Sequence, residues 1–253
     1  MLFTQKLSNL SGFEKKIKSN QFQQAKNKFY SKIKSNSYGF INDLYEKKIE
    51  YIYSFSDKLK NNENIIFLGT GGSSLGGKTL VSIKTNFFLN KKKPQIFFLE
   101  NVDQVSISGL LDQLNMEKTS VVVISKSGET IETLAQFFFI KKIISKTHNY
   151  KKRIYVITEN KQSTLKKIQE EEDYLFIEHN KNIGGRYSVF SVVGLLPAAV
   201  TSFNIKKFVE GGKKFLKFIE NENNFDSFFF FLVSNDFITK KRCQYICNYA
   251  LCG

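Results

Sequence analysis

Short runs of apolar residues recur through the middle of the chain, and stretches with helical spacing of apolar and polar residues separate them. We interpret five runs as strands: Ile65–Leu68, Ile96–Leu99, Val121–Ile124, Ile154–Ile157 and Tyr174–Ile177. Each run is short and apolar at almost every position, which is typical of strands that helices cover on both faces. Helices are expected near 103–114, 130–146 and 165–171. The alternation predicts an α/β fold, a doubly wound five-stranded parallel sheet flanked by helices.

The first sixty or so residues contain no run of this kind. Charged residues alternate there with apolar ones such as Phe40, Ile41 and Leu44, so we expect an N-terminal helical segment over 1–60. The sheet and its helices would then occupy 61–220, and 221–253 would be the start of a second domain.

The chain has 253 residues and a formal net charge of +15. Its lysines are spread along the whole length and accompany many Phe, Asn and Ile residues, which share A/T-rich codons with Lys. We therefore attribute the charge to genome composition and expect no nucleic-acid partner. A basic surface would still attract an anionic substrate.

Nothing in the composition indicates a membrane, a metal or a disulfide framework. No apolar run approaches the roughly 20 residues of a membrane helix, and Met1–Lys6 lacks the apolar core of a signal peptide. Cys243, Cys247 and Cys252 all lie in the last eleven residues, in a spacing that fits neither a disulfide framework nor zinc. We expect a cytoplasmic protein with no cofactor, no metal and no membrane partner.

The ligand site of such a sheet lies beyond the carboxyl ends of its strands. After the first strand, residues 69–76 read G-T-G-G-S-S-L-G. Gly71 and Gly72 would let the backbone approach a ligand, Ser73 adds a hydroxyl, and the next helix start offers free N–H groups to an anion. The loop favours a phosphate cradle, and a plain strand-to-helix turn is the alternative.

The same stretch also fits a different motif. Residues 72–79 read G-S-S-L-G-G-K-T, which matches the P-loop of nucleotide-binding kinases. A P-loop enzyme needs a metal-binding Asp at the end of another strand. The residues at the ends of the second, third and fourth strands are instead Glu100, Ser125 and Thr158. The P-loop kinase is therefore kept as the less favoured alternative.

A second polar loop follows the third strand, where residues 125–130 read S-K-S-G-E-T. Ser125, Ser127 and Thr130 could place three hydroxyls around one anion at a helix start. The ordinary alternative for such residues is capping of the helix N-terminus, for which Thr130 is the candidate.

The third motif, G-G-R-Y-S, covers residues 184–188. Its two glycines free the backbone to present Arg186, whose permanent charge can stabilise an anion that develops on a substrate oxygen. Taken alone, a surface arginine before a helix would be the simpler interpretation.

Together the three motifs resemble the glucose-6-phosphate isomerase family. Residues 71–76 resemble its first phosphate loop, 125–133 its second, and 184–191 a signature stretch that other sugar-isomerase domains lack; the likeness runs from about 40 to 240. The resemblance implies a sugar-isomerase-type domain and, in the full-length family, a homodimer. It also implies the reversible conversion of glucose 6-phosphate and fructose 6-phosphate through an enediolate, in glycolysis and gluconeogenesis.

The resemblance further implies roles for individual residues. The residues expected to hold the sugar phosphate are Ser73, Ser125, Lys126, Ser127 and Thr130, with Lys126 acting through its loop backbone. Gly71, Gly72 and Gly185 would shape the loops around the substrate, and Arg186 would stabilise the enediolate.

The family's glutamate base, and the histidine and lysine that assist ring opening, belong to later motifs that this chain does not contain. We therefore expect an incomplete, inactive chain, with a stand-alone sugar-phosphate-binding regulatory module as the alternative. Glu129 and Glu132 lie beside the second loop, too far from C1 and C2 to replace the base. His148 and His179 are interpreted as solvated structural histidines.

The end of the chain suggests a shifted reading frame. Codons allowed for residues 242–253, read one base later, give Asp-Val-Asn-Ile-Phe-Val-Ile-Met-Pro-Tyr-Val. That is an apolar strand followed by a Pro-Tyr turn, as the family has, and the codons of Lys240 and Lys241 would supply a slippery run of A. We expect a frameshift here through sequencing error, mutation or programmed slippage.

Overall fold

The computed structural model describes residues 20–35, 37–45, 49–84, 94–221, 223–226 and 228–229. The chain divides into two compact units, Gly39–Glu210 and a second one made of Met1–Tyr38 and Gly211–Gly253. The expected frameshift and all three cysteines lie outside the described residues. None of the helices in the described ranges has the length and apolar character needed to cross a membrane.

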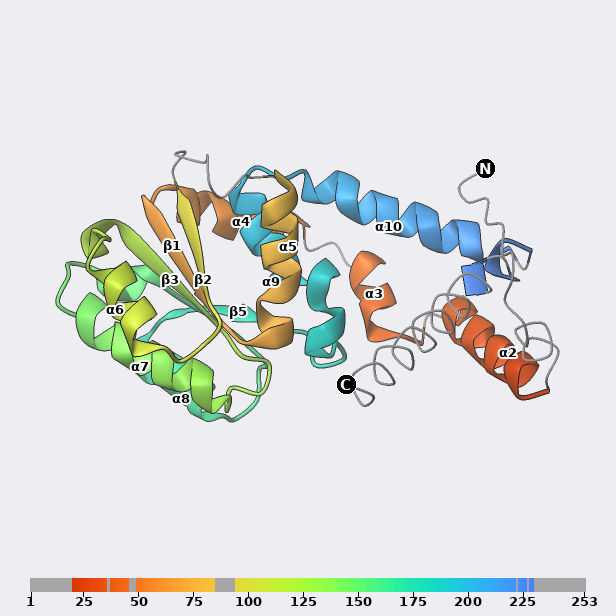
Figure 1. Cartoon of the computed structure of the whole chain (residues 1–253), viewed down its shortest axis with the longest axis horizontal. Helices are drawn as coiled ribbons and strands as arrows, with labels where there is room; N and C mark the ends of the chain where they lie inside the picture. The colour runs from red at the N-terminus through yellow and green to blue at the C-terminus, as the bar shows by residue number, and fades with distance from the viewer. Residues whose placement is uncertain are drawn as a thin grey trace, which may run out of the picture. The chain divides into compact units, whose positions relative to one another are not determined.

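A five-stranded sheet forms the centre of the unit Gly39–Glu210 (Figure 1). Its strands are β1 (Asn64–Leu68), β2 (Gln95–Leu99), β3 (Thr119–Ile124), β4 (Ile154–Thr158) and β5 (Leu175–Glu178). They pair in parallel throughout, in the order β2-β1-β3-β4-β5. The five predicted strands and the parallel sheet are therefore confirmed. Every residue of β1, β3 and β4 is buried, which explains their unbroken apolar runs.

Helices cover both faces of the sheet. One face packs on α6 (Gln104–Leu111), α7 (Ile131–Ile144) and α8 (Thr164–Glu172), and Figure 1 shows these helices together on one side of the strands. The core on that side contains alternate strand residues, among them Ile66, Leu68, Val121 and Val123. The remaining helices near the sheet are α4 (Ile49–Lys60), α5 (Leu75–Lys84) and α9 (Val192–Val200). The doubly wound arrangement predicted from the sequence is confirmed.

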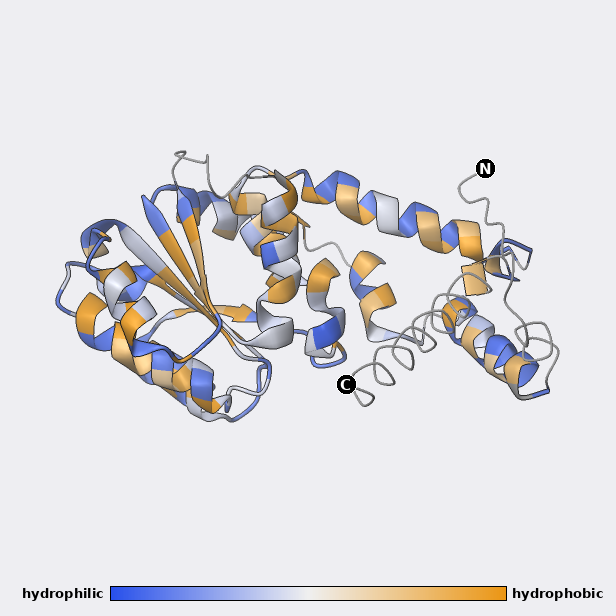
Figure 2. Cartoon of the chain, viewed as in Figure 1, coloured by the Kyte–Doolittle hydropathy of each residue, from blue (hydrophilic) through white to orange (hydrophobic). Residues whose placement is uncertain are grey.

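Helix α9 is buried at all nine positions and packs against α4 and α5. A helix buried on every side has no polar face, and this is why its sequence, V-V-G-L-L-P-A-A-V, lacks the spacing of an amphipathic helix. Ser191 caps its start by accepting a hydrogen bond from the Val193 N–H at 3.2 Å. Figure 2 shows the contrast between the apolar strands and the mixed surfaces of the other helices.

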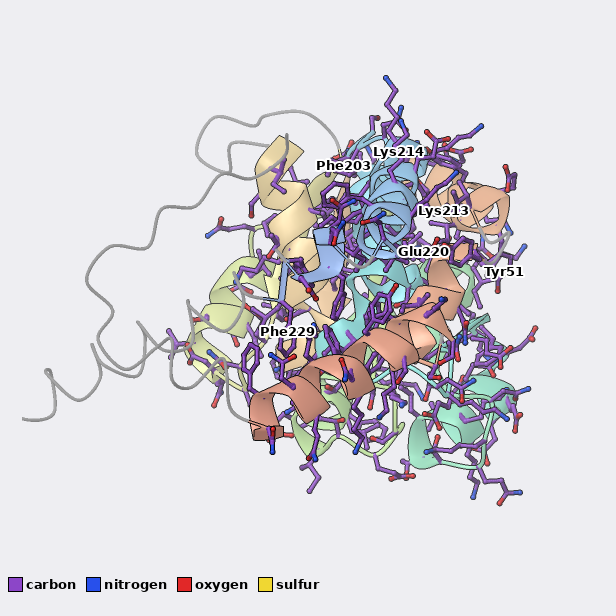
Figure 3. All side chains as sticks on the ribbon, turned by 90° about the vertical axis from the view of Figure 1, so that its right-hand side faces the viewer. Tyr51, Phe203, Lys213, Lys214, Glu220 and Phe229 are labelled. Atoms are coloured by element: carbon purple, nitrogen blue, oxygen red, sulfur yellow. The ribbon has the colours of Figure 1, made fainter. Side chains whose placement is uncertain are left out.

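The remaining helices are α2 (Asn20–Lys34), α3 (Gly39–Tyr45) and α10 (Ile205–Ile219), so the N-terminal helical extension is also confirmed. The domain limits drawn from the sequence stay a prediction, and the unit Gly39–Glu210 includes α3 and α4. In the other unit, Phe29 of α2 lies 5.8 Å from Phe225 and 6.0 Å from Phe229, which Figure 3 labels. These ring contacts hold the two parts of that unit together.

Neighbouring residues of α7 provide a matched test of the core. Phe137 is fully buried, whereas the side chain next to it, Phe138, is 48% exposed. We expect Phe137→Ala to lower the free energy of unfolding by about 3–5 kcal/mol, because it leaves a cavity beneath the helix. Phe138→Ala should cost about 1 kcal/mol or less. Urea denaturation measures both, and equal losses would contradict the packing described here.

Candidate functional site

The loops after β1 and β3 leave adjacent strand ends and lead to helices on opposite faces of the sheet. Leu68 of β1 pairs in register with Val123 of β3, so both loops start at the same level. In the order β2-β1-β3-β4-β5 the chain changes direction between these two strands. Such a switch point leaves a crevice at the carboxyl ends of the strands, where open α/β sheets bind their ligands.

The loop after β1 forms a single 3-10 turn, Gly71–Ser73, before α5 begins at Leu75. The Ser73 N–H donates to the Thr70 carbonyl at 3.1 Å, and the Ser73 side chain is half-buried. Gly71 has a φ of +54°, and a Cβ there would meet only open space. The turn therefore presents a backbone without a side chain on its open side.

Other residues of the P-loop-like stretch 72–79 form hydrogen bonds within the protein. The Lys78 ammonium and the Ser74 hydroxyl both bind the Glu100 carboxylate at the end of β2. Thr79 Oγ1 donates to the Leu75 carbonyl of its own helix at 2.8 Å. Burial pushes the pKa of Glu100 up, but the hydrogen bonds of Lys78 and Ser74 and the Lys78 charge outweigh it and lower the pKa. A P-loop would need this lysine and threonine at a nucleotide phosphate and its metal, so the arrangement disfavours that alternative.

The loop after β3 brings three of the predicted hydroxyls to the start of α7. The buried Ser125 Oγ accepts the Gly128 N–H at 3.1 Å and lies 2.9 Å from Thr130 Oγ1. Ser127 is exposed, and its Oγ accepts the Glu129 N–H at 3.1 Å. Thr130 stands at the capping position of α7, as expected, but its hydroxyl makes no capping hydrogen bond. The N–H groups of the first helical turn are thus left for another acceptor.

The segment between β4 and α8 packs against the loop after β3. Gly128 has a φ of +73°, and a Cβ there would lie well inside 3.0 Å of Ser163, so this position requires glycine. The Glu129 carboxylate accepts the Thr164 N–H at 2.6 Å and the Thr164 hydroxyl at 2.8 Å. These two bonds lower the pKa of Glu129. They also place a carboxylate of the chain itself at the N-terminus of α8, where an external anion would otherwise be attracted.

The third motif packs directly on the first loop. It forms the 3-10 segment η4, Gly185–Phe190. A Cβ on Gly72 would come within 3.0 Å of the Gly185 backbone and of the Arg186 nitrogen, so the two backbones touch. The Ser188 hydroxyl donates to the Gly72 carbonyl at 2.9 Å. Arg186 itself is exposed. The structure therefore places the predicted glycines and Arg186 at one point, beside the switch point of the sheet.

The side chain of Lys126 lies apart from the other predicted residues. Its Nζ donates to the Lys181 carbonyl at 2.9 Å and lies 3.4 Å from a Glu159 carboxylate oxygen. Sequence reasoning missed Glu159 and Ser163. Ser163 precedes a helical run, which is the usual signal of a cap, and its Oγ accepts the Lys166 N–H.

The two histidines differ in their surroundings. His148 is exposed, as expected. The interpretation of His179 as solvated is wrong, because this residue is 2% exposed and its Nδ1 lies 3.0 Å from the Asn180 carbonyl oxygen. Burial lowers its pKa, so the imidazole is neutral at pH 7. Across the described ranges, no three His, Cys, Asp or Glu side chains gather as metal ligands would.

The family model of phosphoglucose isomerase matches residues 46–228, which include the whole sheet and all three motifs. The chain belongs to the phosphoglucose isomerase family. This result confirms the family resemblance that the three sequence motifs indicated.

Similar members of the family include a probable glucose-6-phosphate isomerase of Methanococcus maripaludis, 36% identical over 193 residues. The glucose-6-phosphate isomerase of Methanocaldococcus jannaschii is 30% identical over 202 residues. The matches cover 76% and 80% of this chain but 43% and 48% of these relatives. The chain thus spans about half the length of the curated relatives it matches.

Solved structures agree on the fold. A hypothetical protein from Thermus thermophilus superposes with a TM-score of 0.72 at 23% identity, over 88% of this chain and 55% of that one. A glucose-6-phosphate isomerase from Chlamydia trachomatis superposes with a TM-score of 0.58 at 24% identity, over 68% of this chain and 33% of that one. At these identities the likeness supports the architecture alone.

The contact between Gly72 and Gly185 generates a prediction. We expect Gly72→Ala to lower the free energy of unfolding by about 1–3 kcal/mol or more, because the new methyl group overlaps backbone atoms that cannot rotate away. Gly109→Ala is the control, since a Cβ at that helical position meets open space, and it should stabilise α6 by about 0.5–1 kcal/mol. Thermal and urea unfolding measure both. A neutral Gly72→Ala would show that the two backbones are not in contact.

The lowered pKa of Glu129 predicts a dependence on pH. A carboxylate with a depressed pKa in the folded state contributes stability above its unfolded pKa, and loses it as the pH falls through the folded value. The parent should therefore have a higher Tm than Glu129→Gln at neutral pH, and the gap should close below about pH 4. Glu210→Gln, an exposed carboxylate on α10, is the control. A gap that is unchanged by acid would contradict the ionic cap.

Proposed function

We propose that this chain is the substrate-binding half of a glucose-6-phosphate isomerase. The reaction interconverts glucose 6-phosphate and fructose 6-phosphate through an enediolate, a step of glycolysis and gluconeogenesis. The observation that carries the proposal is the meeting of two hydroxyl-bearing loops at the β1/β3 switch point, with the Arg186 motif packed on the first loop. Membership of the family supports the same reaction.

In this proposal the sugar phosphate lies between the loops after β1 and β3. Ser125 and Thr130 have hydroxyls 2.9 Å apart at the start of α7. Ser127 lies on the same loop, and Ser73 lies on the loop after β1. A phosphate dianion can accept hydrogen bonds from these groups and from the free N–H groups of the helix. The bare backbone at Gly71 allows close approach.

In this proposal Arg186 stabilises the enediolate. Its backbone lies against Gly72, and its guanidinium is exposed beside the first loop. The negative charge of an enediolate oxygen grows as the proton leaves carbon, so a fixed cation stabilises the transition state more than the substrate.

The proton transfer itself needs a base, and three carboxylates near these loops are already engaged. Glu129 caps α8, Glu100 binds Lys78 and Ser74, and Glu159 pairs with Lys126 and Lys161. A general base must be free to accept a proton at the reacting carbon. We propose that the base lies outside the described residues, and we expect the purified chain to bind the sugar phosphate without turnover.

Ligand-induced stabilisation tests the phosphate site. Fructose 6-phosphate at about 100 times its Kd should stabilise the parent by about 2.7 kcal/mol, seen as a higher Tm. The double change Ser125→Ala and Thr130→Ala should remove most of this shift, because it deletes two hydroxyls from the cradle. ATP with magnesium should give no shift in either protein.

Ser145→Ala is the matched control, since this serine caps the other end of α7. It should leave the ligand-induced shift intact. If the double variant is stabilised as strongly as the parent, the loop after β3 is not the phosphate site.

A further inference from the structure

Groups that follow β3, β4 and β5 form one network of ion pairs and hydrogen bonds. The Lys126 ammonium donates to the Lys181 carbonyl and pairs with one oxygen of Glu159. The other oxygen of Glu159 lies 2.8 Å from Lys161 Nζ. The Glu159 N–H donates to the Lys126 carbonyl at 3.2 Å, so side chain and backbone both join the two loops.

The strand order decides where the Lys126 side chain points. β3 lies between β1 and β4, and Ser73 is on the loop after β1. Glu159 follows β4 and Lys181 follows β5, both on the opposite side of β3. The only flexible cation within the loop 125–130 is therefore turned away from the point where the two hydroxyl loops meet.

Partial burial limits the motion of this network, and its ion pairs and hydrogen bonds keep it charged. The Glu159 side chain is 11% exposed and that of Lys126 is 30% exposed. Burial pushes the pKa of Glu159 up, but the hydrogen bonds and charges of Lys161 and Lys126 outweigh it and lower the pKa. The carboxylate is thus ionised at pH 7 and attracts the Lys126 ammonium directly.

We propose that Glu159 withholds the Lys126 ammonium from the phosphate cradle, so that the cradle binds phosphate through hydroxyls and N–H groups alone. The inference rests on the proposed function. A free ammonium on this loop would reach the phosphate and add a charge-assisted bond. Such a bond strengthens the binding of substrate, transition state and product alike, so it retards release without speeding the chemistry. Glu159 is therefore a positioning residue that limits affinity.

The first test measures affinity. Glu159→Gln keeps the shape and the acceptor oxygen but removes the charge, so that only neutral acceptors, among them the Lys181 carbonyl, still hold Lys126. Calorimetry at low salt should show fructose 6-phosphate and inorganic phosphate binding roughly 2- to 5-fold more tightly, the range of a solvent-screened ion pair. The gain should fall at high salt. In a Lys126→Met background, Glu159→Gln should give no gain.

Glu172→Gln is the matched control, because Glu172 also lies between two lysines, Lys141 and Lys151, and its loss changes the net charge equally. It should leave the affinity unchanged. If Glu159→Gln binds both anions as weakly as the parent or more weakly, the inference is overturned. If the parent itself binds no sugar phosphate while Glu159→Gln binds inorganic phosphate, the proposed function fails and the inference stands.

The second test needs no ligand. Mass spectrometry follows the rate at which acetic anhydride acylates Lys126, with the exposed Lys142 as internal reference. We expect Lys126 to react slowly in the parent and severalfold faster in Glu159→Gln, while Lys142 reacts equally in both. Equal rates at Lys126 would overturn the inference whatever the sugar phosphate does.

Discussion

The approach of Gly72 to the backbone of Gly185 and Arg186 is the contact on which the arrangement of the site depends. It joins the loop after β1 to a segment that follows the last strand, and it leaves no room for a side chain at Gly72. The buried helix α9 comes directly after this segment and packs against α5, the helix that the first loop begins. Two independent contacts thus fix the Arg186 backbone relative to the first loop, and this preorganisation is what an electrostatic role requires.

The loop after β3 is held in a different way, through charge. Glu129 caps α8, and Glu159 binds Lys126, so the segment between β4 and α8 supports the loop from both of its ends. The Lys126 and Lys161 ammonium groups also offset the charge of the Glu159 carboxylate, which would otherwise repel a phosphate dianion. Structural support and the electrostatics of the site are therefore provided by the same residues.

The strands were predictable because parallel strands covered on both faces are apolar at every position, as in Val121–Ile124. The predicted ends of helices and strands differ from the observed ends by only a few residues, for example Thr130–Lys146 for the helix observed at Ile131–Ile144. The two loop motifs could be recognised from the sequence because glycine and hydroxyl residues cluster directly after strands. The sequence could not reveal the contact of Gly72 with Gly185, because the two positions are distant along the chain. His179 was misjudged because its neighbours in the sequence are polar, whereas its own side chain is buried and its N–H donates to the Thr158 carbonyl of β4.

The central claim is that phosphate binds where the loops after β1 and β3 meet. A titration of the ¹⁵N-labelled chain with fructose 6-phosphate, followed by amide resonances, tests it most directly. The account predicts that the largest shifts fall on Ser73, on residues 125–133 and on Arg186. Largest shifts at the start of α8, over residues 160–167, would contradict it.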